Sequence, residues 1–422
     1  MNTNVREYRT ARENFFARHA AFWPGTIDDP FDILEPYELP ATDISELVQA
    51  AEAAAALYDR IATLLRTVPN DALLEMGVPP TLLNVVRCVI PGMAHAVLGR
   101  LDLVRTNGGY KLLEFNADTP GLLLETFSVN TKVCEEAQRS DPNAGGEAIL
   151  ARTVLDAIRT GLEYVGKVST EAANIVFTFS RSCRRDGATA EYLVRLVHDV
   201  SPLRVQYAPI EALKIDEKAV CDSVGRPVDV LYRIVSLQYL HAYLLRRSAS
   251  SHTDPDSKDL LFDLVQRRRL ALLNPPSTFL LESKAVQVII WNLFEAGIYF
   301  DDHERRMVEK YMIPTYMDPP SAGEPHVIKP VFGAEGDTVS IVNSNSEPIA
   351  RSLCTTYSNQ RMVYQKYVEL PTIQVMTEDG PRSLHALTSC FLLAGKPVGI
   401  CMRAGGVITD ESAWLLPVCV AE

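Results

Sequence analysis

Two runs of alternating apolar residues flank Asn107-Gly108-Gly109, and this pattern predicts a β-hairpin over residues 100–116. We expect a three-residue loop with a glycine in the left-handed conformation. Such a loop places Thr106 opposite Tyr110 and so fixes the register of both strands. Since side chains alternate between the faces of a strand, one face should turn toward the core with its apolar residues, which are Leu101, Leu103, Leu113 and Phe115.

The other face of this hairpin gathers polar side chains. The register places Asp102 opposite Glu114 and Arg100 opposite Asn116, with Cβ atoms about 5 Å apart in each pair. Like charges directly opposite each other destabilise a sheet, so we expect a compensating cation. Oxygen ligands suit Mg²⁺, whereas Arg100 would instead make this a salt-bridged surface hairpin. If a metal binds, replacing Asp102 or Glu114 by alanine should abolish turnover and leave the fold intact.

The segment after the hairpin is expected to turn sharply and begin a helix. Pro120-Gly121 ends the strand, and residues 122–134 have a composition that permits a helix. A helix N-terminus beside the polar patch would offer backbone N–H groups to an anion. Asp118 and Thr119 would then line the approach of a substrate, or they would simply cap the helix.

Composition excludes several classes of function. The chain has 422 residues, enough for two or three domains, and a net charge of −12 that argues against general binding of nucleic acid or anionic membranes. No apolar run approaches the roughly 20 residues that span a bilayer, and the N-terminus lacks an apolar signal core. Eight scattered cysteines without a Cys-x-x-Cys pair are typical of a reducing compartment. We therefore expect a cytoplasmic protein with small-molecule partners; its oligomeric state has no signature here.

Alternating strand and helix patterns in the middle of the chain predict a small parallel sheet. The pattern places strands at 174–179, 205–208 and 228–235 and a helix at 188–199. Ligands of such sheets bind beyond the carboxyl ends of the strands. Three arginines follow the first strand and suit a carboxylate or phosphate, or else form a solvated basic loop: Arg181, Arg184 and Arg185.

A strand, a glycine-bearing turn and a second strand are predicted over residues 326–342. Gly333 and Gly336 would let the backbone approach a phosphate closely, and Lys329 would reach the same phosphates. No Gly-Lys-Ser/Thr follows, so this is not a Walker loop. An ordinary hairpin turn is the alternative, and the two acidic residues within the turn would oppose a phosphate.

Six segments together resemble the synthetase domain of the glutathionylspermidine synthase family, a branch of the ATP-grasp ligases. They occur in family order from about residue 95 onward, and the second and fourth are the most specific. The amidase domain that some members carry has no counterpart in these residues. The segments are Gly99-Arg-Leu-Asp, Leu113-Glu-Phe-Asn-Ala-Asp-Thr-Pro, Ser283-Lys-Ala, Ile328-Lys-Pro-Val-Phe-Gly-Ala-Glu-Gly, Val363-Tyr-Gln-Lys-Tyr-Val-Glu-Leu-Pro and Gly399-Ile-Cys-Met-Arg.

This resemblance implies a mixed α/β (α+β) ATP-grasp fold with permuted order. The metal-bearing antiparallel sheet would come first, a small parallel α/β subdomain in the middle, and the ATP-covering lobe later. The expected divisions are 1–166 for N-terminal helices and the metal-binding core sheet, 167–273 for the substrate-side subdomain, 274–370 for the nucleotide lobe and 371–422 for strands returning to the core sheet.

The resemblance also implies an ATP-dependent carboxylate–amine ligase. A substrate carboxylate would attack the γ-phosphate of ATP, and an amine would attack the resulting acyl phosphate to give an amide, ADP and phosphate. By similarity, Mg²⁺ would be bound by the three residues that the hairpin register brings together: Asp102, Glu114 and Asn116. Lys284 and Lys329 would hold the ATP phosphates beneath the glycine turn, while Gln365, Lys366 and Tyr367 would edge the adenine. Arg100 and Arg403 would stabilise charge on the transferring phosphoryl group and the acyl phosphate.

Two departures from the family pattern argue against a polyamine acceptor. Near residue 230 the family usually has a Tyr-Pro-Trp-Glu-Trp-like run, but this chain has Arg233-Ile-Val-Ser-Leu-Gln-Tyr, and Ala-Gly-Gly follows Arg403. A polyamine carries several positive charges and requires carboxylates, so we expect a different acid and amine. Two alternatives stay open: a non-catalytic ATP-grasp-like nucleotide-binding protein, and a phosphotransferase that stops at a phosphorylated product.

Overall fold

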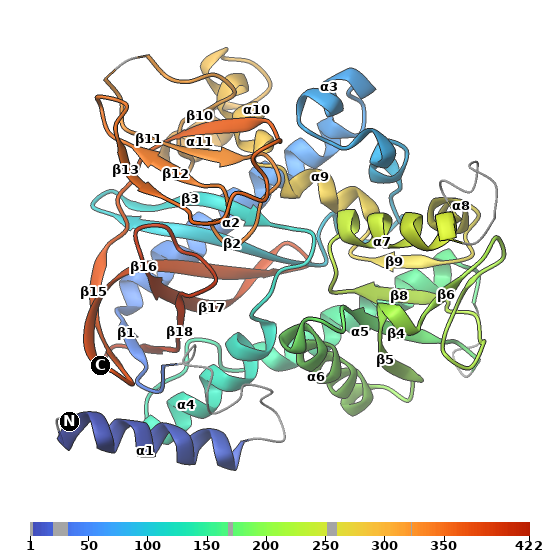
Figure 1. Cartoon of the computed structure of the whole chain (residues 1–422), viewed down its shortest axis with the longest axis horizontal. Coiled ribbons are helices and arrows are strands. Elements are labelled where there is room, and N and C mark those ends of the chain that lie inside the picture. Colours follow the sequence, from blue (N-terminus) through green and yellow to red (C-terminus); the bar gives the residue numbers. More distant parts are fainter. Residues whose placement is uncertain (1–2, 20–32, 168–171, 251–259, 322) are drawn as a thin grey trace.

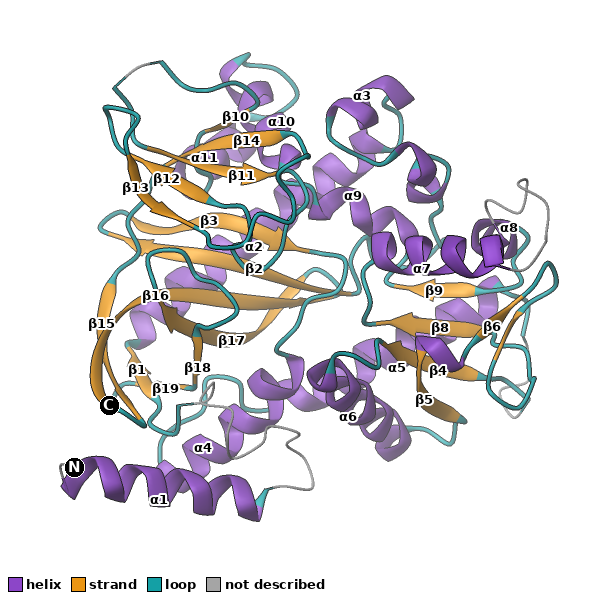
Figure 2. Cartoon of the chain, viewed as in Figure 1, coloured by secondary structure: helices purple, strands orange, loops and turns teal. Residues whose placement is uncertain are grey.

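The computed structural model describes residues 3–19, 33–167, 172–250, 260–321 and 323–422. Within these ranges, three sheets of four or more strands form the framework, and Figures 1 and 2 show them with their covering helices. The mixed α/β class is therefore confirmed. No helix in the described ranges combines the length and apolarity needed to cross a bilayer. All eight cysteines are free thiols.

The central six-stranded sheet is antiparallel and joins the hairpin to the C-terminal strands. Its order is β18-β17-β16-β2-β3, with β15 pairing with β16. The long helix α2 (Ala41–Leu65) buries an alanine- and leucine-rich face in the same core as the inward side chains of β2 and β3. The strands are β2 (Leu98–Thr106), β3 (Gly109–Asn116), β15 (Thr372–Thr377), β16 (Gly380–Leu393), β17 (Lys396–Gly405) and β18 (Trp414–Leu416).

The predicted hairpin exists, but its turn is shorter than expected. Only Asn107 and Gly108 form the loop, so Thr106 pairs with Gly109 and not with Tyr110. A β-bulge then inserts one extra residue in β3. The bulge restores the expected pairs of Asp102 with Glu114 and of Arg100 with Asn116.

The same bulge changes which leucine faces the core. Leu112 pairs with Leu103 and is fully buried, whereas Leu113 lines the central cavity beside Glu114. The prediction that Leu113 faces the core was therefore wrong. The cause is the extra residue, because it breaks the strict alternation of side chains along the strand.

A four-stranded parallel sheet lies in the middle of the chain and confirms the predicted strand–helix–strand unit. Its order is β5-β4-β8-β9, and alternate side chains of β4 enter separate cores. One core includes α5 and α6, and the other includes α7 and α8, so both faces are covered. The elements are α5 (Gly146–Tyr164), β4 (Ile175–Phe179), α6 (Arg184–Val200), β5 (Val205–Pro209), β8 (Val230–Arg233), α7 (Leu237–Ser250), α8 (Leu260–Gln266) and β9 (Ala271–Leu273).

A five-stranded antiparallel sheet forms the third part, and Figure 1 shows it above the hairpin strands. Its order is β10-β14-β11-β12-β13, and the predicted glycine turn joins β11 to β12. The elements of this part are α9 (Phe279–Glu282), α10 (Ala285–Glu295), α11 (Asp302–Tyr311), β10 (Thr315–Tyr316), β11 (His326–Pro330), β12 (Ser340–Val342), β13 (Pro348–Arg351) and β14 (Met362–Lys366).

Shorter elements close the edges of these three sheets. A π-helical turn, η3 (Glu125–Val129), leads directly into α4 (Asn130–Ala137). The N-terminal helix α1 (Thr3–Arg18) lies near the C-terminus in Figure 1, and Arg9 Nε donates to the Glu378 carbonyl at 2.7 Å. The remaining short elements are β1 (Tyr37–Leu39), α3 (Asn70–Glu75), η1 (Pro80–Leu82), η2 (Val85–Arg87), η4 (Ile210–Ala212), β6 (Lys214–Ile215), β7 (Val220–Cys221), η5 (Pro276–Thr278) and β19 (Val418–Val420).

Candidate functional site

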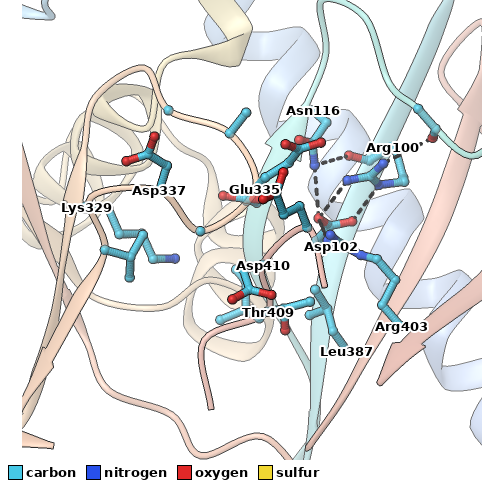
Figure 3. A pocket seen from close by; sticks show the side chains of 18 of the residues that line it. Arg100, Asp102, Asn116, Lys329, Glu335, Asp337, Leu387, Arg403, Thr409 and Asp410 are labelled. Carbon is cyan, nitrogen blue, oxygen red and sulfur yellow. Dashed lines mark hydrogen bonds and ion pairs between the residues drawn. The ribbon is translucent and has the colours of Figure 1, made fainter. Parts of the chain in front are cut away.

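A cavity of about 460 Å³ is lined by all three parts of the fold. That volume lies within the range of small-molecule sites. Its floor is the polar face of the hairpin together with β16 and β17, and β11 and β12 form one wall. Residues at the start of α6, the glycine turn and the loop 407–411 complete the lining. Figure 3 shows the hairpin residues and Lys329 projecting toward this cavity from different strands.

Asp102 is the hub of the floor, and it is fully buried. Its Oδ1 accepts hydrogen bonds from Arg100 Nε at 2.8 Å and Ser389 Oγ at 2.7 Å. Its Oδ2 accepts from a terminal guanidinium nitrogen of Arg403 at 2.8 Å, from Arg100 at 3.1 Å and from Asn116 Nδ2 at 3.1 Å. Burial opposes ionisation, but the two guanidinium groups hold the pKa of Asp102 below its ordinary value. The positive charge that was expected to compensate the carboxylate pair therefore comes in part from Arg100, as in one of the two alternatives, and in part from Arg403.

Glu114 is compensated by a lysine from another lobe. Lys284 Nζ lies 3.4 Å from Glu114 Oε2 and donates to the carbonyl of Gly333 at 2.9 Å. Burial raises the pKa of Glu114, but Lys284 and Lys329 outweigh burial and lower it. Lys284 thus ties the hairpin to the first residue of the glycine turn.

Lys329 is buried, and its pKa is lowered to about 8 chiefly because burial disfavours the ammonium form. Its Nζ donates to Gln365 Oε1 at 2.8 Å, and Gln365 Nε2 donates to Gln287 Oε1 at 2.6 Å. Four cationic side chains, two from the floor and two from other elements, therefore surround the two hairpin carboxylates: Arg100, Arg403, Lys284 and Lys329.

The three residues predicted to edge an adenine have different placements. Tyr367 lines the cavity, but Gln365 is buried behind Lys329 and Lys366 is exposed, and neither of these two is among the lining residues. Their alternation along β14 explains the difference, because Gln365 points inward and Lys366 outward. Gln365 thus supports Lys329, and the Lys366 side chain faces solvent; the adenine role of both residues stays a prediction.

The part of the cavity near Tyr367 is apolar. Branched side chains from β11, β12, β16 and the segment after β14 line it: Val327, Val339, Ile341, Val368, Leu370 and Leu387. A flat aromatic heterocycle suits such a slot. The four cationic side chains described above also line this cavity.

The glycine turn covers the cavity and touches the C-terminal loop. Gly336 has φ +68°, and a Cβ atom there would lie 2.9 Å from the Thr409 carbonyl oxygen and 2.8 Å from Ile408 Cγ2. Only glycine accepts this backbone conformation and this contact together. Gly333 also lines the cavity, and its carbonyl accepts from Lys284. Figure 3 shows Glu335 and Asp337 on the same turn.

Asp118 and Thr119 both line the cavity, yet the Asp118 carboxylate is already engaged. A guanidinium nitrogen of Arg233 donates to Asp118 Oδ2 at 2.9 Å, its other terminal nitrogen donates to Oδ1, and the backbone N–H of Leu237 donates to Oδ2 at 2.8 Å. Asp118 therefore joins the loop after the hairpin to β8 and the start of α7. The substrate role of Asp118 and Thr119 stays a prediction, and both residues line the cavity.

Several carboxyl groups that line the cavity were not predicted from the sequence, among them Glu125, Asp186 and Glu282. Glu282 Oε2 accepts from the backbone N–H groups of Ala117 and Asp118 at 2.6 and 2.9 Å, and burial raises its pKa to about 7. Burial likewise raises the pKa of Asp186 to about 6. Glu282 stands two residues before Lys284, but nothing in its local pattern links it to the hairpin.

The residues on the floor suit a divalent cation shared with phosphates. Glu114 lines the cavity, and Asn116 points its amide nitrogen at Asp102, which leaves its amide oxygen as an acceptor. With Asp102 they form an all-oxygen set that suits Mg²⁺ when phosphates supply further ligands. The oxygens of Asp102 already accept five hydrogen bonds, so Glu114 is the most open ligand. In the described ranges, no group of three or more His, Cys, Asp or Glu side chains forms a denser metal site.

Comparison with known proteins finds relatives that are named as ligases. A candidate acid–amine ligase of Haemophilus influenzae is 23% identical over 66% of this chain and 64% of its own length. The bifunctional glutathionylspermidine synthetase/amidase of Escherichia coli is 19% identical over 75% of this chain and 47% of its own length. The chain thus spans less than two thirds of these relatives.

A solved structure and a family model complete the comparison. The apo structure of a glutathione synthetase-like effector from Globodera pallida matches 92% of this chain and 90% of its own, with a TM-score of 0.57 and 13% identity, which shows a shared fold. The model of the glutathionylspermidine synthase preATP-grasp family matches residues 34–421. With nearly the whole chain matched by that model, this protein belongs to the glutathionylspermidine synthase family.

Proposed function

We propose that this protein is an ATP-dependent carboxylate–amine ligase that forms an amide through an acyl phosphate. The observation that carries the proposal is the cavity itself. Four cationic side chains surround the oxygen-bearing hairpin residues. Next to them lies an apolar slot that suits a purine. We also propose that the three sheets form a permuted ATP-grasp fold, in which 274–370 acts as the nucleotide lobe, 167–273 as the substrate-side subdomain, and 1–166 with 371–422 as the core.

In this proposal the four cations hold and polarise the reacting groups. Phosphoryl transfer depends mainly on positioning and charge stabilisation. Lys329 and Lys284 would bind the ATP phosphates, because they enter the cavity from the nucleotide lobe. Arg100 and Arg403 would stabilise charge on the transferring phosphoryl group, since Asp102 fixes both guanidinium groups on the floor.

Glu114, Asn116 and Asp102 would hold Mg²⁺. When bound, the ion would neutralise and orient the phosphate oxygens. The apolar slot and Tyr367 would receive the adenine, and the glycine turn over the floor would exclude water from the acyl phosphate.

The test is ADP release from ATP and Mg²⁺ with glutathione or glutamate as the acid and glycine, ethanolamine, 1,4-diaminobutane or spermidine as the amine. We expect ADP formation that requires an acid, and a hydroxamate when hydroxylamine replaces the amine. ATP binding without acid-dependent ADP formation would favour a non-catalytic binding protein. ADP formation with a stable phosphorylated product and no hydroxamate would favour a phosphotransferase. A best pair of glutathione and spermidine would contradict the expectation that the acceptor is not a polyamine.

A further inference from the structure

Glu125 is a buried carboxyl group that the proposed roles above leave unused. Only 5% of the residue is exposed, and it lines the cavity. Its Oε2 has no hydrogen-bond partner in the structure. A buried acceptor without a partner is costly, so a retained one suggests a ligand that completes it. The charged groups that act on it are Arg185, Asp186 and Arg100.

The backbone around Glu125 is held rigidly. Glu125 begins the π-helical turn η3, and such turns occur frequently at functional sites. Phe127 in this turn packs so closely on Gly399 and Gly146 that Cβ atoms there would lie 2.5 and 2.9 Å from its ring. Asn143 Nδ2 donates to the Thr126 carbonyl at 3.2 Å. The backbone that carries the Glu125 carboxyl group is therefore fixed in place by its neighbours.

Two groups of charged side chains line the cavity from different elements. Lys284 and Lys329 enter from the nucleotide lobe, whereas Arg185 and Asp186, near the start of α6, act on Glu125. We call this second group the acidic end, because it holds two carboxyl groups and one guanidinium group. Arg100 acts on Glu125 and also binds Asp102, so it lies between the floor and the acidic end. A group bound next to Glu125 would therefore adjoin the place proposed for the acyl phosphate.

We propose that Glu125 binds the ammonium group of the acceptor amine and removes a proton from it before amide formation. This inference rests on the proposed ligase function. A carboxylate with an open oxygen attracts an ammonium group and repels the carboxylate of the acid substrate. Ser236 and Gln238 also line the cavity and carry no charge, so the site suits an acceptor with one ammonium group at the reacting end.

The proton and electron-pair transfers of this step involve only the amine, the acyl phosphate, Glu125 and solvent. The R–NH₃⁺ group gives one proton to the Glu125 carboxylate and becomes an amine. The nitrogen lone pair attacks the acyl carbon, a C–N bond forms, and the C–O bond to the phosphate breaks with its electron pair on oxygen. The second nitrogen proton moves to the leaving phosphate, which departs as HPO₄²⁻. The amide keeps the third proton, and Glu125 returns its proton to solvent.

The experiment compares two acceptors in Glu125→Gln with the fastest acid from the screen above. General-base catalysis contributes about a hundredfold or more, so we expect kcat/KM for amide formation with ethanolamine, glycine or 1,4-diaminobutane to fall about a hundredfold. Hydroxylamine is uncharged near neutral pH, so hydroxamate formation should stay within about twofold of wild type. The matched control is Glu135→Gln, an exposed residue of the following helix, which should leave both rates unchanged.

Stability measurements separate a chemical role from a structural one. Glutamine keeps the shape of Glu125 and removes a buried charge, so the urea midpoint of Glu125→Gln should equal or exceed that of wild type. Wild-type amide rates in the variant, equal losses of amide and hydroxamate, or a lowered urea midpoint would each overturn the role of Glu125. Absence of any hydroxamate from wild type would instead overturn the ligase proposal on which this inference rests.

Discussion

At the scale of single residues, the floor of the cavity depends on one buried carboxylate. Asp102 accepts from two guanidinium groups, an amide and a hydroxyl group, and these donors come from four strands. This arrangement changes the expectation that Asp102 is dispensable for folding. Removing it would leave Arg100 and Arg403 buried without their anion, which is costly.

Asp102→Asn should therefore lower the free energy of unfolding by about 3–5 kcal/mol. Urea denaturation followed by circular dichroism measures this. Glu114→Gln is the matched variant, because its carboxylate has one lysine partner and borders the cavity. It should cost about 1 kcal/mol or less and still abolish Mg²⁺-dependent ADP release. Equal stability of wild type and Asp102→Asn would contradict the structural role of Asp102.

Lys329 should make nucleotide affinity depend on pH. With a pKa near 8, the free protein holds the ammonium form below pH 8 and the neutral amine above it. Because phosphate binding requires the ammonium form, ATP affinity should fall as pH rises from 7 to 9. In Lys329→Met, affinity should be about tenfold to a hundredfold weaker at pH 7, as expected from losing a charge-assisted hydrogen bond, and that pH dependence should disappear.

Isothermal titration calorimetry with ATP and Mg²⁺ measures these affinities. The control is Lys366→Met, since Lys366 is exposed one residue beyond Gln365 and outside the cavity lining. It should bind ATP as wild type does at every pH. An unchanged pH profile in Lys329→Met would remove Lys329 from the phosphate site.

At the scale of elements, the glycine turn between β11 and β12 matters because it meets the loop 407–411. Gly336 combines a positive φ with a contact that leaves no room for a side chain. An alanine there would both strain the backbone and push the turn away from Thr409. The turn would then close less completely over the floor.

Gly336→Ala should therefore increase the share of ATP hydrolysed without amide formation, because water reaches the acyl phosphate. The ratio of ADP to amide product measures this leak, and we expect it to rise severalfold above the wild-type ratio. Gly225→Ala is the matched control: Gly225 has φ +83° but no atom within 4 Å of an added Cβ. Gly225→Ala therefore strains the backbone without displacing a neighbour, and it should leave the ratio of ADP to amide unchanged.

At the scale of the whole molecule, the buried pair of Asp118 and Arg233 joins the parallel sheet to the hairpin loop. Arg233 is 1% exposed and Asp118 is 2% exposed. Asn274, just after β9, adds further links, since its Nδ2 donates to the carbonyls of Leu98, Ala117 and Asp118 at 2.9, 3.0 and 3.0 Å. The cavity exists only while these contacts hold the parallel sheet against the core.

Arg233→Met should lower the free energy of unfolding by about 3–5 kcal/mol, because Asp118 would remain buried without its cation. The double variant with Asp118→Asn should cost less than the sum of the single variants, since the pair is coupled. Differential scanning calorimetry also reports whether the parallel sheet then unfolds separately. Arg226→Met, which breaks a more exposed ion pair within the same sheet region, should have the smaller effect. Strictly additive losses would contradict the coupling.

The sequence by itself determined the local features of the site. Alternation of side chains around Asn107-Gly108 specified a hairpin with Asp102, Glu114 and Asn116 on one face, because strand periodicity is a local property. The strand–helix–strand pattern likewise specified the parallel sheet, and the ordered motifs pointed to the family that the comparisons show. The predicted loop was one residue too long, but the bulge restored the register of Asp102 and Glu114.

Only the tertiary structure decided which distant groups meet. Arg403 and Ser389 reach Asp102 because β16 pairs with β2 across nearly 300 residues of chain, a pairing that no local pattern encodes. Pairing of β11 with β14 likewise placed Gln365 behind Lys329, and tertiary packing left Oε2 of Glu125 without a hydrogen-bond partner. Local periodicity fixes the face on which a side chain lies, whereas long-range packing fixes its partners and its pKa. The hairpin residues on the floor of the cavity could therefore be predicted from the sequence, but the partners that balance their charges could not.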